Sequence, residues 1–235
     1  MARRRVLLKM SGESLCQPGG FGIEPKIVLD LAKQIQAALA SNDVELAMVV
    51  GGGNFLRGEQ VAGQGIDRVT GDNMGMLATI MNSLALQSAL EGVGIETRVQ
   101  SAIQVNDVAE PFIRRRCIRH LEKGRVVILA GGTGHPYFTT DTTAALRAVQ
   151  LGATMLLKAT KVRGIFSADP VKNPDAQFYE TVTFIEVLQK RLKVMDSTAI
   201  SLCMDNGLPI HVFSMRESGN VERVLRGERL GTVVH

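Results

Sequence analysis

The sequence predicts an α/β fold, a three-layer αβα sandwich with a mainly parallel central sheet. Short β-rich runs alternate with segments whose apolar residues recur at helical spacing, and short connections join them. Several runs are apolar throughout, most clearly Val126–Leu129, which is typical of strands buried on both faces of a parallel sheet. The 235 residues show no internal repeat and no linker-like shift in composition, so we expect a single domain over residues 1–235.

The strands and helices follow from these patterns. Strands are expected at Val6–Met10, Val44–Val50, Glu96–Val99, Arg125–Ala130, Thr154–Leu157 and Ile210–Phe213. The apolar positions that predict helices are Ile27, Leu31, Ile35 and Leu39, then Leu77, Ile80, Met81 and Leu84, then Ala144, Ala145, Ala148 and Val149. Pro25 suits the start of the first helix, and Gly152 suits the end of the third.

A soft boundary is expected near Leu151–Ala153. Glycine-rich turns are dense before it, whereas Lys161–Phe178 beyond it contains Gly, Pro and Asp and is expected to form a hairpin or a long loop. The domain then has two lobes, at about 1–152 and about 153–235.

Composition excludes several classes of protein. Aromatic residues make up 4% with no Trp, which disfavours a base-stacking nucleic-acid platform. The three cysteines, Cys16, Cys117 and Cys203, form no CxxC pair, so neither a disulfide framework nor a zinc site is expected. No apolar stretch approaches the roughly 20 residues of a membrane span. A protein of the reducing cytoplasm fits these features.

The net charge is +4, a mild excess that suits a protein binding small anions. Two clusters concentrate it, Arg3–Arg5 and Arg114–Arg116 with Arg119. Runs of charge are usually solvated, so we expect a solvated chain end and a solvated helix face, and we do not expect a nucleic-acid interface.

Glycine and polar residues follow four of the predicted strands, at Lys9–Glu13, Gly51–Asn54, Gly131–His135 and Lys158–Lys161. Ligands bind outside the carboxyl ends of strands in open α/β sheets, where glycine lets the backbone N–H groups approach an anion. One such turn often serves packing alone. Four turns at one edge predict a site for a polyanion.

Common nucleotide motifs are absent. No Gly-Lys pair exists to complete a P-loop, and Leu56 stands where a dinucleotide-binding GxGxxG beginning at Gly51 needs its third glycine. The HRD and DFG motifs of protein kinases are also missing.

Seven runs, in order over nearly the whole chain, carry a family resemblance: Lys9–Glu13, Gly51–Gly58, Asp72–Thr79, Gly132–Asp141, Lys158–Gly164, Ala168–Pro170 and Lys193–Asp196. They resemble the bacterial uridylate kinases of the amino acid kinase superfamily. Asp72–Thr79 and the run ending in Thr140–Asp141 are specific to that branch. Relatives acting on aspartate, acetylglutamate or carbamate share only the Lys/Gly framework.

The resemblance implies an amino acid kinase-like fold and a kinase that transfers the γ-phosphate of ATP to UMP, giving UDP and ADP on the route to CTP. It implies catalytic roles for Lys9, Arg57 and Asp141. Implied ATP contacts are Lys9, Met10, Ser11, Gly12, Gly53, Arg57, Thr160, Phe166 and Asp169. Implied UMP contacts are Gly52, Asp72, Thr133, Gly134, His135, Pro136, Tyr137, Phe138, Thr139 and Thr140. No protein metal site is expected, because Mg²⁺ can bind on the ATP phosphates.

The chemistry of the residues suits these roles. Phosphoryl transfer needs positioning and neutralisation of charge, which Lys9 at a strand end and the forked guanidinium of Arg57 can supply. Asp141 would orient the lysine through an ion pair. The alternative interpretation is that Asp141 caps the helix that begins there. Asp72 suits the ribose hydroxyls better than a phosphate. His135 replaces the Asn usual in the family, which leaves the function intact but adds a possible charge near the acceptor phosphate.

Other positions have weaker assignments. Phe166 can line an adenine pocket or pack in the core, Asp169 can bond the ribose or cap a turn, and Asp196 has no assigned role. The resemblance also implies a homohexamer that GTP activates and UTP inhibits. Ile27, Ile80 and Leu84 are candidates for the subunit seam. The candidates for residues that respond to GTP are Arg98, Arg125 and the loop Gln17–Gly22.

Two alternatives remain open on the sequence. The first is a related kinase that phosphorylates a small carboxylate or carbamate, against which the Asp72 and Thr133–Thr140 runs argue. The second is a nucleotide-sensing or DNA-associated regulator, which the arginine clusters motivate and the modest net charge disfavours.

Overall fold

The computed structural model describes residues 3–40, 44–56, 65–168, 172–173, 175–192, 194–217 and 219–235. These residues form one nine-stranded sheet in the order β4-β3-β5-β2-β1-β6-β10-β11-β9. The strand bounds are β1 Arg4–Met10, β2 Val44–Val50, β3 Thr97–Ser101, β4 Glu110–Pro111, β5 Val126–Ala130, β6 Met155–Thr160, β9 Thr181–Val182, β10 Ile210–Ser214 and β11 Thr232–Val234. Neighbouring strands are parallel except for β10 and β11. The predicted α/β class with a mainly parallel sheet is confirmed.

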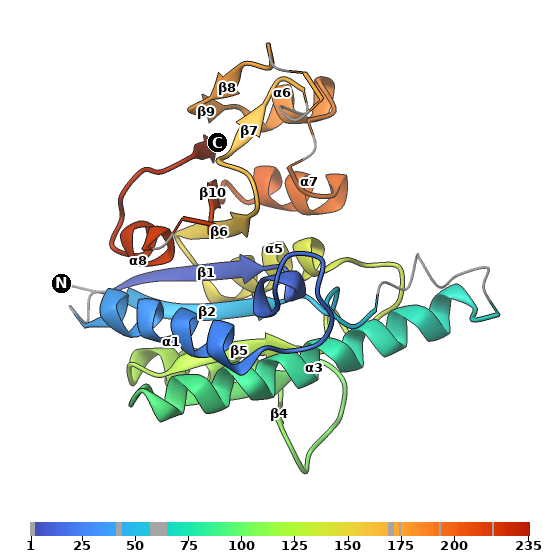
Figure 1. Cartoon of the computed structure of the whole chain (residues 1–235), viewed down its shortest axis with the longest axis vertical. Helices are drawn as coiled ribbons and strands as arrows, with labels where there is room; N and C mark the ends of the chain where they lie inside the picture. Colours follow the sequence, from blue (N-terminus) through green and yellow to red (C-terminus); the bar gives the residue numbers. More distant parts are fainter. Residues whose placement is uncertain are drawn as a thin grey trace.

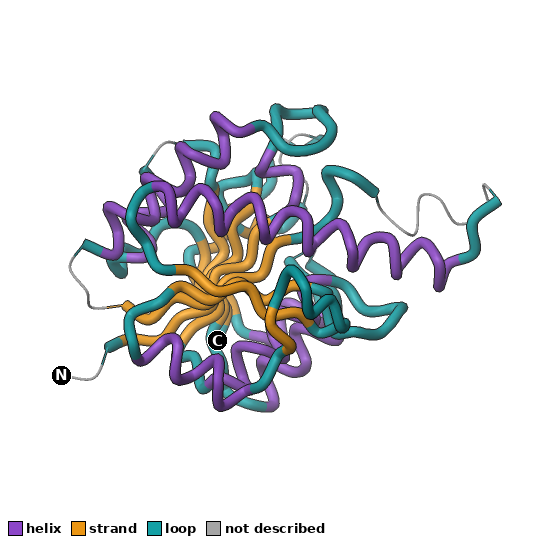
Figure 2. The backbone as a smooth tube through the Cα atoms, turned by 90° about the horizontal axis from the view of Figure 1, so that it is seen from below, coloured by secondary structure: helices purple, strands orange, loops and turns teal. Residues whose placement is uncertain are grey.

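Helices cover both faces of the twisted sheet, which Figure 2 shows from below. One core cluster packs α1 (Pro25–Leu39), α3 (Arg68–Gly92) and α8 (Asn220–Leu225) on the first face. The other packs α4 (Arg114–Glu122), α5 (Thr140–Leu151), α6 (Phe184–Gln189) and α7 (Ser197–Asp205) on the second face. Figure 1 shows α1 and α3 side by side along the sheet. The architecture is therefore the predicted three-layer sandwich.

The β1 strand explains how the sheet presents a polar side chain at its end. Side chains alternate along a strand, so Val6, Leu8 and Met10 pack in the core with α1 and α3, whereas Leu7 packs in the core with α5. Lys9 has the same parity as Leu7 and therefore lies on the α5 face. After Met10 the chain turns into a short 3₁₀ helix, η1 (Gly12–Leu15), at the carboxyl edge of the sheet.

The predicted strands agree with the observed ones to within one to three residues at each end. Pro25 is the first residue of α1, and Gly152 caps α5 in the left-handed conformation. The expected hairpin within Lys161–Phe178 is present as the antiparallel pair β7 (Ile165–Phe166) and β8 (Phe178–Tyr179). The sheet continues across the expected lobe boundary through the β1–β6 pair.

Two expectations about surfaces were wrong. Ile80 is 4% exposed within one chain and belongs to the core, so its side chain is not available for a subunit seam. The exposed large apolar residues of that helix are Val69, Met74, Leu77 and Met81. Arg4 and Arg5 are not a solvated chain end, because Arg4 donates to the Leu225 carbonyl and Arg5 pairs with Glu45 at 2.7 Å. By contrast, Arg114–Arg116 are exposed on α4, as expected.

Gly231, just before β11, gives a stability prediction. Its φ is +92°, and an added Cβ would lie 2.1 Å from the Val212 carbonyl oxygen. We expect Gly231→Ala to lower the free energy of unfolding by at least about 3 kcal/mol, because close backbone contact and a left-handed φ both oppose a side chain. Urea denaturation tests this, with Gly207→Ala as the control, since Gly207 is also left-handed but has nothing within 4 Å. Equal losses in the two variants would contradict the packing argument.

Candidate active site

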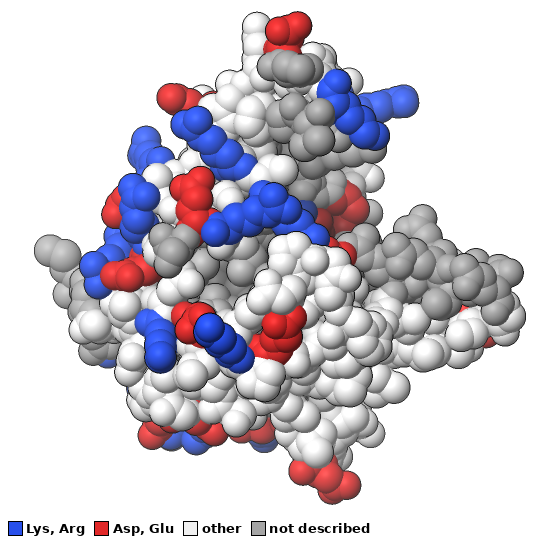
Figure 3. Space-filling view, viewed as in Figure 1, with Lys and Arg blue, Asp and Glu red and all other residues white. Residues whose placement is uncertain are grey.

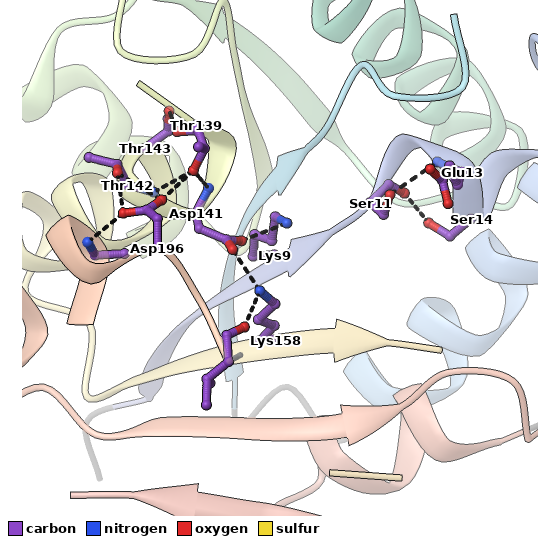
Figure 4. A network of polar contacts seen from close by, with 12 residues as sticks. Lys9, Ser11, Glu13, Ser14, Thr139, Asp141, Thr142, Thr143, Lys158 and Asp196 are labelled. Carbon is purple, nitrogen blue, oxygen red and sulfur yellow. Dashed lines mark hydrogen bonds and ion pairs between the residues drawn. The ribbon is translucent and has the colours of Figure 1, made fainter. Parts of the chain in front are cut away.

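The register of β1 against β6 places two lysines side by side, because Lys9 pairs with Lys158. Both side chains lie on the face that α5 covers, and Asp141 in the first turn of α5 lies between them (Figure 4). One carboxylate oxygen is 2.6 Å from Lys9 Nζ, and the other is 2.6 Å from Lys158 Nζ. Lys158 also donates to the Val194 carbonyl at 2.5 Å. The carboxylate therefore fixes both ammonium groups in one geometry.

This triad is held largely out of water. The exposed fractions of the side chains are 10% for Lys9, 15% for Asp141 and 12% for Lys158. Burial opposes ionisation of Asp141, but the two lysines outweigh it and hold its pKa below the ordinary value. Burial, assisted by the Lys9 charge, lowers the pKa of Lys158 despite the attraction of Asp141. Two cations around one carboxylate leave surplus positive charge, which suits an anion.

The start of α5 is fixed by a second carboxylate. Thr139 is the N-cap residue, and its hydroxyl accepts from the amide of Asp141 at 3.0 Å. The Asp196 carboxylate accepts from the hydroxyls of Thr139 and Thr142, and it also caps α7 by accepting from the amide of Ala199 at 2.8 Å. Asp141 is therefore not the helix cap, and Asp196 acquires a role in joining the starts of α5 and α7.

The turns after β1 and β2 approach each other closely at the same edge. A Cβ on Gly12 would lie 2.4 Å from the Gly51 carbonyl oxygen, and the Gly51 amide donates to the Met10 carbonyl at 2.9 Å. Two buried amides lie beneath the turns. Asn54 and Asn82 exchange hydrogen bonds at 2.9 and 2.7 Å, and their remaining N–H groups reach the carbonyls of Gly22 and Gly51. All four amide hydrogens are used, so this pair is fully satisfied.

The β5–α5 connection faces these turns. Its residue Tyr137 donates its amide N–H to Asp72 Oδ2 at 2.8 Å, and Arg68 Nε donates to the same oxygen at 2.8 Å. The Thr133 hydroxyl closes a turn with the backbone of His135 at 3.2 Å. One oxygen of Asp72 therefore binds the connection itself, and its other oxygen has no hydrogen-bond partner among the described residues.

A cleft of about 580 Å³ unites these features. The predicted residues that line it are Lys9, Ser11, Gly52, Gly53, Asp72, Thr133, His135, Phe138, Thr139, Thr140 and Asp141. The described predicted residues outside this lining are Met10, Gly12, Gly134, Pro136, Tyr137, Thr160 and Phe166. Met10 is fully buried, so only its backbone can face a ligand. Arg57 and Asp169 fall outside the described residues.

A larger groove of about 720 Å³ lies between α8 and the β10–β11 pair. It lacks the paired lysines and the glycine turns, so the smaller cleft is the candidate active site. Phe166 packs edge-on against Phe178, which lines this groove, with ring centroids 5.2 Å apart. The Thr160 hydroxyl donates to the Val162 carbonyl at 2.7 Å. Neither residue lines the smaller cleft, although Thr160 ends the strand that carries Lys158.

No three His, Cys, Asp or Glu side chains gather as a metal site among the residues that the structure describes. The two carboxylates near the lysines already have partners. Asp141 pairs with both lysines, and Asp196 accepts from the hydroxyl of Thr142 and the amide of Ala199.

Three functional residues were not predicted. Lys158 and Asn54 lay within turns that the sequence marked, but neither was given a role, and Asn82 was not singled out. The alternation of polar Lys158 within an apolar strand is a signal that was available.

Comparison with known proteins places these features in context. Residues 4–214 match the amino acid kinase family. The uridylate kinase of Deinococcus radiodurans is 56% identical over 232 residues, covering 98% of this chain and 94% of the relative. The structure of UMP kinase from Bacillus anthracis superposes with a TM-score of 0.94 at 38% identity, covering 100% and 97% of the two chains. UMP kinase from Ureaplasma parvum gives 0.92 at 38% identity, covering 100% and 99%.

Proposed function

This chain belongs to the amino acid kinase family, and we propose from that premise that it transfers the γ-phosphoryl group of ATP to UMP, giving UDP and ADP. The observation that carries the proposal is the buried Lys9–Asp141–Lys158 triad between the glycine turns and the β5–α5 connection. The relatives named above, uridylate and UMP kinases, support the choice of substrate. A kinase for a small carboxylate or carbamate is not favoured.

The reaction needs positioning and charge neutralisation. A phosphate oxygen of UMP forms the new bond to the γ-phosphorus, and the bond to the bridging oxygen of ADP breaks. Lys9 and Lys158 offset the negative charge of the transferring group. Asp141 acts as a positioning group and not as a base, because its pKa is lowered and both of its oxygens face lysines. The UMP phosphate is already ionised and needs no base.

The two nucleotides bind from opposite sides of the triad. On the acceptor side we assign Asp72 to the ribose through its remaining oxygen, and the segment Thr133–Thr140 with Gly52 to the phosphate. On the donor side we assign Ser11 and Gly53, which line the cleft, to the ATP phosphates, together with the adjoining Gly12 and the backbone of Met10. We assign the rest of the ATP side to Thr160, Phe166, Arg57 and Asp169. The lobe at about 1–152 then carries the UMP contacts and the turns that meet the ATP phosphates, and the lobe at about 153–235 completes the ATP side. Mg²⁺ accompanies the nucleotide and neutralises phosphate charge.

Assembly and regulation follow the family. The exposed apolar residues Met74, Leu77 and Met81 of α3 suit a subunit contact within a homohexamer. Figure 3 shows few charges over the middle of α3, whereas charges of both signs intersperse elsewhere on that face. GTP as activator and UTP as inhibitor complete the proposal. Arg98 and Arg125, candidates for the GTP response, pair with Glu91 at 3.6 Å and Glu96 at 2.6 Å, respectively.

A cytoplasmic location completes the proposal. All three cysteines are free and buried, as in a reducing compartment. Burial raises the pKa of Cys117 and of Cys203 to about 12, so these thiols are unreactive. None of the described helices has the length and apolar character needed to cross a bilayer.

The direct test is ADP formation from MgATP, with and without UMP. We expect turnover that depends on UMP and rises with GTP. An acceptor screen with aspartate, acetylglutamate and carbamate provides the comparison. Turnover with one of these acceptors and none with UMP would reverse the assignment.

A further inference from the structure

Tyr137 adopts a backbone conformation that residues with a Cβ rarely occupy. Its φ is +70°, and among the described non-glycine residues only Arg191 shares a positive φ. The residue is 66% exposed, so core packing does not hold it there. A strained residue in the segment assigned to the acceptor therefore needs another restraint.

The restraint comes from the start of α3. Asp72 Oδ2 accepts the Tyr137 amide at 2.8 Å, and Arg68 donates to the same oxygen at 2.8 Å. The Arg68 guanidinium carbon also lies 5.6 Å from the centre of the Tyr137 ring, within the range of a cation–π contact. Backbone and ring of Tyr137 are thus held by two residues one helical turn apart.

Helix stability does not explain this pair. Arg68 is the first residue of α3, where the helix dipole disfavours a cation. A cation four residues before an anion is also the weaker orientation for a helical ion pair. The arrangement is better explained by what it holds, the β5–α5 connection that leads through the Thr139 cap to Asp141.

We propose that Arg68 is a positioning residue for the acceptor: together with Asp72 it clamps Tyr137 in the left-handed conformation and so shapes the segment that receives UMP. The inference rests on the proposed function and deepens it. Asp72 then has a second role besides the ribose contact, because one of its oxygens binds the protein and the other remains for the substrate.

A double-mutant cycle tests the clamp. Arg68→Met keeps the aliphatic stem and removes the charge. We expect it to raise the KM for UMP about tenfold and to change the KM for ATP by less than about twofold. A tenfold change corresponds to the combined free energy of holding a residue in the left-handed conformation and of a cation–π contact. In a Tyr137→Gly background the same substitution should change the KM for UMP by less than about twofold, because glycine needs no clamp. Arg115→Met, the same substitution on the exposed face of α4, serves as the matched control and should change neither KM.

Equal increases in both backgrounds would show that Arg68 touches the acceptor directly and would overturn the clamp. An unchanged KM for UMP, or parallel changes for UMP and ATP, would also overturn it. If Arg68→Met does not fold, Tyr137→Ala is compared with Tyr137→Gly: the clamp requires the higher KM for UMP with alanine. Wild-type turnover is measured first, because its absence counts against the proposed function and its presence isolates the clamp.

Discussion

Asp141→Asn is expected to lower kcat by about 100- to 1000-fold. The amide keeps the shape of the carboxylate but removes the charge that holds two buried ammonium groups in place. Lys9 and Lys158, neighbours in the β1–β6 register, then repel each other without a shared partner. Initial rates at saturating ATP and UMP measure the effect. Asp205→Asn is the matched control, because Asp205 is exposed at the end of α7.

The loss of stability in the Asp141→Asn variant should also depend on pH. Because Lys9 and Lys158 hold the pKa of Asp141 below its ordinary value, the carboxylate contributes stability above about pH 4, the pKa of an unfolded Asp. That contribution disappears as the pH falls through the lower pKa of the folded state. The difference in unfolding free energy between wild type and Asp141→Asn should therefore shrink below about pH 4. A difference that stays constant between pH 6 and pH 3 would contradict the ion-pair geometry.

The sequence predicted the parts of the fold that depend on local pattern. Apolar runs marked the central strands, and the turns Lys9–Glu13 and Gly51–Asn54 were placed at one edge because parallel strands share it. The short strands β4, β9 and β11 were not predicted, because two or three residues carry no periodicity. Helical spacing also predicted α3 but not its buried side, since Ile80 and Leu77 fit the same period and only the sheet decides between them.

The same distinction between local pattern and long-range contact applies to the residues of the site. Lys9 and Asp141 were predicted through motif resemblance, whereas the role of Lys158 depends on register between strands that are distant in the chain. The Asn54–Asn82 pair could not be predicted, because a reciprocal amide contact leaves no trace in spacing. The left-handed Tyr137 was equally hidden, since the restraint that selects it comes from α3. Long-range geometry, and not residue type, sets these features.

Gly12→Ala is the second change expected to have a large effect. The added Cβ would lie 2.4 Å from the Gly51 carbonyl oxygen, 2.4 Å from Asn54 Oδ1 and 2.9 Å from Asn82 Nδ2. None of these atoms can yield easily, because the first is backbone and the other two belong to the fully satisfied, buried amide pair. The methyl group must therefore push the turn after β1 away from the turn after β2.

We expect the displacement to lower kcat/KM for ATP by about 100-fold, since small misplacements of reacting groups cost that much. The free energy of unfolding should fall by about 1–3 kcal/mol from overpacking. Steady-state kinetics with ATP as the varied substrate and urea denaturation measure the two effects. Gly92→Ala is the matched control: Gly92 ends α3 with nothing within 4 Å, so alanine there should keep full activity and equal or higher stability. Wild-type kcat/KM in Gly12→Ala would mean that the two turns need not touch, and the phosphate-binding role of their contact would have to be abandoned.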